Sequence, residues 1–357
     1  MSQSTKHIIH NMAALFTTCL YPKYCITLLA LTFIITGNIA YCEHPPFEKP
    51  EDFPLMGDWT GQWINPQRGH EEHDPSLAAQ LLPMGNDTYK VVLVSELFKR
   101  AEPYAVMTAQ STNGKLELAQ DGWNATFENG EAYGEALLHG DTVQFALKQQ
   151  KLLSPTLGKP APENAVILFN GTSYEHWHHQ DGREVTWRIT DEGAMEVVSL
   201  FWNNRENEVK GLGGNIETKD SFQEFELHVE YRYAVEPDLR GQGRGNSGLI
   251  IPGIGELQIL NSYTTIGYYD ENGALYKTAP ARVNASAPPL QWQTYDVTVR
   301  FSNNKDDAIL LTAYLNGHRI HYDWEIETAD RDFNFVLQDH INRIQFRNIW
   351  VRPLNNE

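Results

Sequence analysis

Cysteine is scarce in this sequence of 357 residues, and its placement is uneven. The three cysteines, Cys19, Cys25 and Cys42, all lie within the first 42 residues. The chain that follows therefore contains no internal disulfide and no cysteine-based metal site. Its stability must come from a hydrophobic core, which a chain of this length can bury.

Positive charge is also in short supply. The sequence has 28 Lys and Arg against 46 Asp and Glu, which gives a formal net charge of −18. Lys6 and Lys23 are the only Lys, Arg, Asp or Glu residues among the first 42, so removing that stretch would make the chain still more acidic. Such a surface repels nucleic acid and anionic lipid but tolerates a neutral ligand. The composition therefore argues against a nucleic-acid partner.

Long apolar runs are absent except for Tyr24–Ala40, near the N-terminus. This run follows a weakly basic start and precedes polar, proline-bearing sequence from Glu43, which is typical of a secretory signal. A membrane anchor is one alternative, although a spanning helix needs about 20 apolar residues. A lipid anchor at Cys42 is another, but Tyr41 is unfavourable just before such a site. We predict a cleaved signal over residues 1–42 and an exported, periplasmic or extracellular protein that is free of the membrane after cleavage.

Amphipathic helices are missing as well, because no segment sustains an apolar period of 3.6 residues. Between residues 56 and 150, short β-like runs instead alternate with turns rich in Gly and Asn, at spacings of roughly ten residues. This spacing predicts a small antiparallel β domain, either a barrel or a sandwich. The clearest runs are Tyr89–Val94, Gly114–Leu118, Gly134–Leu138 and Thr142–Leu147.

A linker and a second, larger β domain follow. Residues 151–164 are rich in proline, which predicts the linker. Within residues 165–354, apolar and polar residues alternate along Phe225–Arg232 and Thr294–Phe301, and Asn316-Gly317 indicates a tight hairpin. Alternation of this kind predicts strands with one face in a core. We therefore predict an all-β protein whose larger domain packs two antiparallel sheets face to face.

The stretch from Arg244 to Tyr263 carries the strongest functional signal. It predicts two apolar strands joined by a Pro-Gly-Ile-Gly turn. Because alternate side chains of a strand point to opposite faces, Leu257 can enter a core while Glu256 and Gln258 stand side by side on the other surface. A carboxylate and an amide placed together in this way indicate a polar cleft.

Four polar groups are expected to meet on one sheet face. They are Glu230 with Arg232, Asn246 with Ser247, Glu256 with Gln258, and Gln338-Asp339-His340 followed by Arg347. A carboxylate close to Arg and His can act as a base or an acid once its pKa is moved. Tyr263 and neighbouring aromatic residues offer apolar faces for sugar rings, while amides and carboxylates bond sugar hydroxyls. The alternative for each group is a solvated row on a two-faced strand.

Two histidine clusters have the composition of metal sites without the spacing. His70–Asp74 and His176–His179 fit no strong metal motif, and a solvated loop or turn is the better interpretation of each. The sequence also lacks a phosphate-binding loop, a nucleophile elbow and a dinucleotide fingerprint. Carboxylates and amides could hold a divalent cation, but no spacing requires one, so the cofactor stays open.

Six motifs within residues 165–354 resemble a known family. They are Leu168–Ser173, Phe225–Arg232, Gly245–Gly248, Glu256–Leu260, Asn284–Pro289 with Trp292–Asp296, and Leu337–His340 with Phe346–Trp350. Together they closely resemble the 3-keto-disaccharide hydrolase family. The resemblance implies a concanavalin-like β jelly roll with its site on the concave sheet. It also implies cleavage, by elimination and hydration, of disaccharides or glucosides that carry a ketone at C3.

The resemblance further implies roles for the residues at matching positions. Glu230 and Glu256 are expected as site carboxylates, with His340 as an alternative base or acid that Asp339 orients. The residues expected to bind the substrate are Arg232, Asn246, Ser247, Gln258, Tyr263 and Arg347.

Three positions depart from the family pattern. Asn261 stands where Asp is usual, and Leu290 and Ile341 stand where Gly is usual. The first departure can weaken a charge in the site. Two other functions therefore stay open beside the enzyme: a non-catalytic carbohydrate-binding protein, and a structural surface protein without a small ligand.

Overall fold

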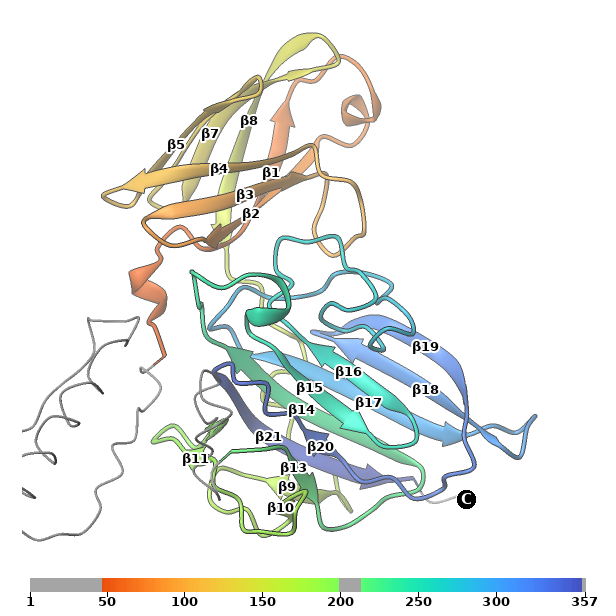
Figure 1. The fold of residues 1–357 in the computed structure, drawn as a ribbon. Helices are drawn as coiled ribbons and strands as arrows, with labels where there is room; N and C mark the ends of the chain where they lie inside the picture. Colours follow the sequence, from red (N-terminus) through yellow and green to blue (C-terminus); the bar gives the residue numbers. More distant parts are fainter. Residues whose placement is uncertain (1–46, 199–212, 355–357) are drawn as a thin grey trace, which may run out of the picture. The chain divides into compact units, whose positions relative to one another are not determined.

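The computed structural model describes residues 47–198 and 213–354, which belong to one compact unit of the chain. Strands form nearly all of the regular structure in this part (Figure 1). The helices described there are short 3-10 turns: η1 (Pro50–Asp52), η2 (His70–Glu72) and η4 (Gly241–Gly243). None of the described helices has the length and apolar character needed to span a bilayer. The predicted export signal, residues 1–42, lies outside the described residues.

The first eight strands close into an antiparallel barrel. Strand β1 pairs with β2 on one side and with β8 on the other, which completes the circle. The interior is aromatic: Trp59, Trp63, Phe127 and Phe145 are almost fully buried. The strands are β1 (Gly57–Ile64), β2 (Ser76–Pro83), β3 (Thr88–Val94), β4 (Ala105–Thr112), β5 (Lys115–Gln120), β6 (Trp123–Glu128), β7 (Glu131–Leu138) and β8 (Asp141–Gln150).

Alternation within each barrel strand decides which side chains fill the interior. In β8, Val143, Phe145 and Leu147 are buried, while Thr142 and Gln144 are exposed. The same period of two recurs around the circle, because each strand has one face toward the interior and one toward solvent. The prediction of a small antiparallel β domain is confirmed, and a closed barrel is the form that it takes.

Two sheets packed face to face form the rest of the described chain (Figure 1). The smaller sheet has the strand order β10 (Trp177–His179), β13 (Ile216–Thr218), β20 (Val336–Leu337), β15 (Ser247–Ile251) and β16 (Gly255–Ile259). The larger, eight-stranded sheet has the order β11 (Arg188–Ile189), β12 (Met195–Glu196), β21 (Ile344–Pro353), β14 (Phe225–Tyr233), β17 (Gln293–Phe301), β18 (Ala308–Leu315) and β19 (His318–Glu327), with β9 (Val166–Phe169) paired to β21.

Apolar residues from both sheets meet in one core. Leu227, Val229 and Tyr231 of β14 contribute to it from the larger sheet, and Leu257 and Ile259 of β16 contribute from the smaller sheet. Full burial of such side chains stabilises the fold by roughly 1.5–3 kcal/mol each. Because this core uses one face of each sheet, the polar residues of the same strands lie on two separate outer faces.

The two turns that the sequence indicated are both present. Asn316 and Gly317 have φ of 51° and 79°, as a two-residue hairpin turn requires, and they join β18 to β19. The Pro-Gly-Ile-Gly turn joins β15 to β16, with Gly253 at φ 84°. The prediction of an all-β jelly-roll sandwich preceded by a smaller antiparallel β domain is confirmed.

Candidate functional site

The outer face of the five-stranded sheet carries the predicted carboxylate and amide pair. The register of β15 and β16 sets Gly248 opposite Gln258 and Ile250 opposite Glu256. Leu257, between the two polar residues, is buried in the core. Glu256 and Gln258 therefore point away from the core, in agreement with the alternation of the sequence.

Glycine at position 248 creates the space that Glu256 occupies. A Cβ atom built on Gly248 would lie 2.2 Å from Oε1 of Glu256 and 3.0 Å from its Cγ. A larger residue at position 248 would force the carboxyl group to move away from its present place. The glycine therefore allows Glu256 to lie against the backbone of β15.

Glu256 is half-buried, and no ion pair involving it is present in the part of the chain that the structure describes. Burial disfavours the charged form of the carboxyl and raises the pKa of Glu256 to about 7. A carboxyl group with this pKa is partly ionised at neutral pH, so it can accept or release a proton. These properties make Glu256 the strongest acid–base candidate on this face.

Three amide side chains form a network that reaches this carboxyl group through Gln258. Gln258 Nε2 lies 3.3 Å from Gln242 Oε1 and 3.4 Å from Asn246 Oδ1. If the Gln258 amide is turned by 180°, its nitrogen donates instead to Glu256 Oε1 at 3.0 Å and to the Ser247 carbonyl oxygen at 3.1 Å. Gln258 and Asn246 are 1% and 3% exposed, so these amides form a buried network behind Glu256 that supports its position.

Gln242 is a member of this face that the sequence analysis missed. It lies in η4 between Gly241 and Gly243, and its Nε2 donates to the Asp270 carbonyl oxygen at 2.7 Å. The one sequence feature that could have indicated Gln242 is its position, as a polar residue in a glycine-rich loop just before Asn246. A loop has no regular alternation, so strand patterns do not reveal which way its side chains point.

Gln338 extends the polar face across the neighbouring strand. Its backbone N–H donates to the Gly248 carbonyl oxygen at 3.0 Å, which sets it beside Gly248 just after β20. The side-chain Oε1 is buried and has no hydrogen-bond partner among the described residues. Because a buried acceptor without a partner is costly, this oxygen is suited to a hydroxyl of a bound ligand.

Ser247, Asp339 and His340 lie near the same sheet but differ in exposure. The Ser247 hydroxyl is fully buried and donates to the Gln338 carbonyl oxygen at 2.7 Å. The Asp339 carboxylate accepts the backbone N–H of Gly214 at 2.7 Å and that of Ile341 at 3.0 Å. His340 is exposed directly after it. The predicted roles of these three residues toward a substrate stay predictions.

Glu230, Arg232 and Arg347 lie on the opposite surface of the sandwich. Glu230 and Arg232 flank Tyr231 in β14, and Tyr231 enters the core. Glu230 is paired with Arg347 across β14 and β21, on the outer face of the eight-stranded sheet. The prediction that all four polar groups share one face is therefore wrong for these residues, because the core separates them from Glu256.

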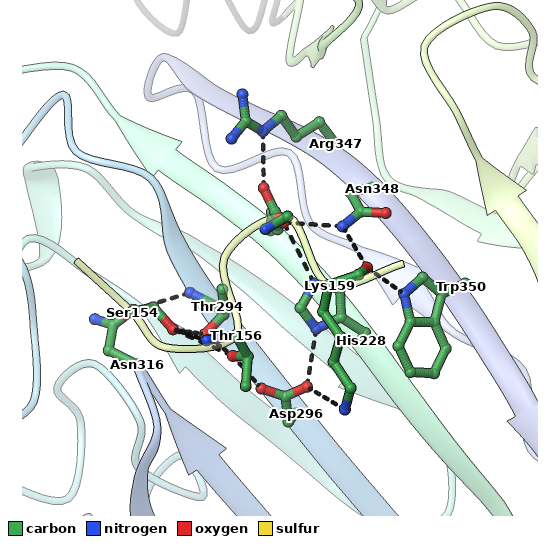
Figure 2. Close-up of polar contacts among 12 residues, drawn as sticks. Ser154, Thr156, Lys159, His228, Thr294, Asp296, Asn316, Arg347, Asn348 and Trp350 are labelled. Atoms are coloured by element: carbon green, nitrogen blue, oxygen red, sulfur yellow. Dashed lines mark hydrogen bonds and ion pairs between the residues drawn. The ribbon is translucent and has the colours of Figure 1, made fainter. Parts of the chain in front are cut away.

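A buried ionic cluster occupies that second face (Figure 2). His228, which has no exposed surface, lies between two carboxylates: its Nδ1 is 2.9 Å from Asp296 Oδ1, and its Nε2 is 3.4 Å from Glu230 Oε1. Arg347 Nε donates to Glu230 Oε2 at 2.8 Å. Trp350 stacks on the imidazole with a centroid separation of 5.3 Å. The cluster is enclosed, which suits a structural role.

The predicted linker covers this cluster. The backbone N–H of Gly158 donates to Glu230 Oε1 at 2.5 Å, and the Thr156 hydroxyl donates to Asp296 Oδ2 at 2.6 Å. Lys159 adds a contact of 3.5 Å to Asp296 Oδ1, and Figure 2 shows its segment crossing the strands beside the cluster. The linker is therefore fastened to the sheet through Asp296 and through Glu230, and of these two only Glu230 was predicted as a site residue.

Electrostatics explain why these charges can be buried. Burial acts to lower the pKa of His228, but hydrogen bonds to Asp296 and Glu230 outweigh it and raise the pKa above its ordinary value. Burial acts to raise the pKa of Glu230, but hydrogen bonds from His228, Asn348 and Arg347 lower it to about 2. The charged forms of these groups therefore stabilise one another.

Arg232 and Arg347 are both in contact with Trp292. Their guanidinium groups lie 4.6 Å and 4.0 Å from the centre of the Trp292 ring. Arg232 also donates to Gln345 Oε1 at 2.7 Å and to Glu192 Oε2 at 2.9 Å. These contacts occupy the two arginines that were expected to bind the substrate.

Tyr263 does not line the candidate site. Its side chain is 1% exposed, and its hydroxyl donates to Asp58 Oδ1 at 2.8 Å. The prediction that Tyr263 contacts a sugar does not fit this enclosed position. Tyr268 and Tyr269, by contrast, are about half exposed.

Metal binding gains no support from the described side chains. No group of three or more His, Cys, Asp or Glu residues within 47–198 and 213–354 is placed to hold an ion. In the His70–Asp74 segment, Glu71 is fully buried, accepts from the Tyr104 hydroxyl at 2.9 Å and lies 2.9 Å from His139 Nε2. The expectation of a solvated loop is wrong at Glu71, because these contacts anchor it to the barrel.

Comparisons with known proteins bear on the sandwich. Residues 164–352 match the model of a family described as a 3-keto-alpha-glucoside-1,2-lyase-like domain, which is more than half of the chain. A crystal structure of a Parabacteroides distasonis protein provisionally assigned as a glycosyl hydrolase is 27% identical, with a TM-score of 0.45 and coverage of 54% of this chain and 85% of that one. A second, from the same organism and with the same assignment, is 16% identical, with a TM-score of 0.39 and coverage of 54% and 95%. A comparison with curated proteins finds no match.

Removing one charge from the buried cluster should be costly. We expect Glu230→Gln to lower the free energy of unfolding by about 3 kcal/mol, because it breaks an enclosed ion pair. Glu226→Gln on the same strand is the matched control. Glu226 forms a partly exposed pair with Arg352 at 2.6 Å, and its loss should cost about 1 kcal/mol or less. Denaturant unfolding measures both, and equal losses would contradict the cluster.

The contribution of His228 to stability should depend on pH. Because folding raises the pKa of His228 above 6.5, its contribution is complete below that pH and is lost as pH rises through the folded pKa. Glu230, lowered from 4.5 to about 2, contributes above pH 4.5 and loses its contribution as pH falls toward 2. The difference in unfolding free energy between wild type and His228→Gln should therefore be greatest near pH 5–6. A difference that grows at alkaline pH is the contrary result.

Proposed function

The chain belongs, through residues 164–352, to the family of 3-keto-α-glucoside-1,2-lyase-like domains, and from this membership we propose that it cleaves glycosides whose sugar carries a ketone at C3. The family acts on carbohydrates, so a saccharide or glycoside is the ligand. The cleavage takes place on the outer face of the five-stranded sheet, where Glu256, Gln258, Asn246 and Gln338 come together.

The observation that carries the proposal is the raised pKa of the half-buried Glu256 carboxyl group. Burial raises its pKa to about 7, and amide side chains lie beside it. A general base works best when its pKa lies near the working pH, since it is then both available and strong enough to take a proton. An ordinary exposed carboxylate would be a much weaker base.

A ketone at C3 acidifies the proton on the adjacent C2, and Glu256 removes that proton. The electron pair released at C2 forms an enolate with the ketone oxygen. When the C3 carbonyl re-forms, a C1–C2 double bond appears and the C1–O bond breaks with its electron pair on the leaving oxygen. A proton from Glu256 or from His340 completes the leaving alcohol or sugar. The other product is a 2-hydroxy-3-keto-glycal.

Water completes the hydrolysis by adding to the double bond. Its oxygen bonds to C1 and a proton returns to C2, which gives the free 3-keto sugar. This route needs one base and hydrogen-bond donors for the enolate, and it needs no second carboxylate at the separation found in ordinary glycosidases. Glu230, on the opposite surface, is therefore not required for the reaction.

Amide donors suit the enolate better than a cation would in this site. N–H groups of Gln338 can stabilise the negative oxygen without a full charge next to the base, whereas the side-chain N–H groups of Asn246 are already bonded to Gln242. A fixed cation beside Glu256 would lower its pKa and weaken it as a base. The lack of an ion-pair partner for Glu256 among the described residues is therefore part of the proposed mechanism.

Replacing Glu256 tests the proposal directly. We expect Glu256→Gln to lower kcat on a 3-keto-disaccharide at least about 100-fold, the lower end of general-base contributions. Glu217→Gln is the matched control. Glu217 lies on the same sheet face but pairs with His178 at 3.7 Å and accepts from Asn334 at 3.1 Å, so its loss should leave turnover within about twofold.

The pH profile supplies a second readout. In wild type, kcat/KM should rise with pH with a midpoint near 7, because Glu256 must be ionised to accept the C2 proton. A profile that is flat from pH 5 to 8 contradicts the role of Glu256. Absence of turnover with retained sugar binding would identify a carbohydrate-binding protein instead of an enzyme.

We also propose that the protein is exported. The support is the apolar run Tyr24–Ala40, placed between a weakly basic start and polar sequence. Fractionation of a bacterial host that expresses the full chain, with N-terminal sequencing of the product, should yield a chain that has lost residues up to about Cys42 in the periplasm or medium. An uncleaved cytoplasmic product is the contrary result.

A further inference from the structure

The chain segments that carry the candidate site are both bonded to the barrel. One segment, Arg240–Gly248, carries Gln242 and Asn246. The other, Glu256–Thr264, carries Glu256 and Gln258. We call them the two site segments. The backbone N–H of Asn261 in the second donates to the Arg244 carbonyl oxygen of the first at 3.2 Å, so the segments are also joined to each other.

Arg244 fastens the first site segment. This side chain is only 3% exposed, and its Nη2 donates to the carbonyl oxygen of Pro83, at the end of barrel strand β2, at 2.8 Å. Its Nε donates to the Val235 carbonyl oxygen at 3.0 Å on the sandwich side. At the start of the segment, Arg240 Nη2 donates to the Met84 carbonyl oxygen at 2.9 Å. Bonds from a charged, buried donor are among the stronger ones in proteins.

Tyr263 fastens the second site segment. Its buried hydroxyl donates to Asp58 Oδ1 in β1 at 2.8 Å, and Gln80 Nε2 in β2 donates to the same oxygen at 3.1 Å. Asp58 is itself only 3% exposed. Loss of one donor would leave a buried carboxyl group with fewer hydrogen bonds, which carries a penalty. The contact therefore holds the segment and the barrel together.

The residue after Tyr263 shows that this attachment fixes the backbone. Thr264 has φ of 72°, a conformation that is an outlier for a β-branched residue. Its carbonyl oxygen accepts from Lys90 Nζ in β3 at 3.0 Å. Strained backbone persists where the surroundings over-determine it, and it is commonly found next to functional sites.

We propose that the barrel is a positioning element of the site, and that Tyr263 and Arg244 are the positioning residues through which it acts. They set where the two site segments leave the five-stranded sheet. The positions of Glu256, Gln258 and Asn246 relative to one another follow from that. The effect on turnover rests on the proposed function, whereas the effect on the backbone does not.

The predicted consequence is a change in rate more than in binding. A small displacement of a base from the proton that it removes is costly, and about 1 Å can cost about 100-fold. Tyr263→Phe should therefore lower kcat by about tenfold or more and leave KM within about threefold. Amides of both site segments should exchange with solvent at least tenfold faster, whereas those of β17 and β18 should not change.

Two further variants separate positioning from general loss of stability. Tyr233→Phe removes another buried hydroxyl, one that donates to the Ala287 carbonyl oxygen at 2.9 Å within the sandwich, so it is the matched control. Asp58→Asn retains an oxygen that can accept from Tyr263, and it should rescue both exchange and turnover relative to Asp58→Ala. The measurements are hydrogen exchange by mass spectrometry, steady-state kinetics and thermal unfolding on the full chain.

Each outcome decides the proposal. The proposal is supported if exchange becomes faster only in the site segments of Tyr263→Phe and Asp58→Ala. In the same segments, Tyr233→Phe and Asp58→Asn should exchange like wild type. Unchanged exchange in Tyr263→Phe overturns it. Equal effects in Tyr263→Phe and Tyr233→Phe overturn it too, because they indicate general destabilisation. If wild type turns over no 3-keto-glycoside, the proposed function fails, and the exchange measurements still decide the role of the barrel.

Discussion

The register between β15 and β16 is the constraint on which the candidate site depends. It sets Gly248 and Gln258 opposite each other. Because Gly248 has no side chain, Glu256 can lie against the backbone of β15 at that position. In that place burial removes water from the carboxyl group, no described residue forms an ion pair with it, and its pKa rises to about 7. A shift of one residue in this pairing would turn Glu256 toward the core and remove the site.

Two glutamates of the same sandwich show how surroundings decide chemistry. Glu230 has no exposed surface, whereas Glu256 is partly exposed. The pKa of Glu230 nevertheless falls to about 2, because His228, Arg347 and a backbone N–H from the linker favour its charged form. Glu256 has no such partners among the described residues, so burial dominates. Glu230 therefore stays ionised and stabilises the buried cluster, whereas Glu256 is able to exchange a proton near neutral pH.

The alternation of residues in the sequence predicted much of the fold. It indicated β14, β16 and β17, and the dipeptide Asn316-Gly317 indicated a hairpin, because these signals are local and follow from strand geometry. It also showed that Glu230 and Glu256 both point away from a core. It could not show that they point to different surfaces, since that depends on which sheet each strand joins, and long-range pairing has no local signal.

The attachments made by loops and the linker were the least predictable from sequence. Proline-rich sequence identified residues 151–164 as a connection, but the docking of Gly158 and Thr156 on the eight-stranded sheet depends on backbone groups and short hydroxyls that carry no pattern. Likewise, Tyr263 has the composition of a sugar platform, and its contact with Asp58 joins residues far apart in the chain. The family resemblance is the source of the proposed substrate class, which the spacing of residues alone does not contain.

The central claim is that Glu256 is a half-buried carboxyl, without an ion-pair partner among the described residues, whose pKa lies near 7. This claim can be tested without any substrate. Infrared difference spectra of wild type minus Glu256→Gln, recorded across a pH titration, isolate the carboxyl stretching bands of this one residue. The account predicts a titration midpoint close to 7. A midpoint near 4.5, the ordinary value for glutamate, would contradict it.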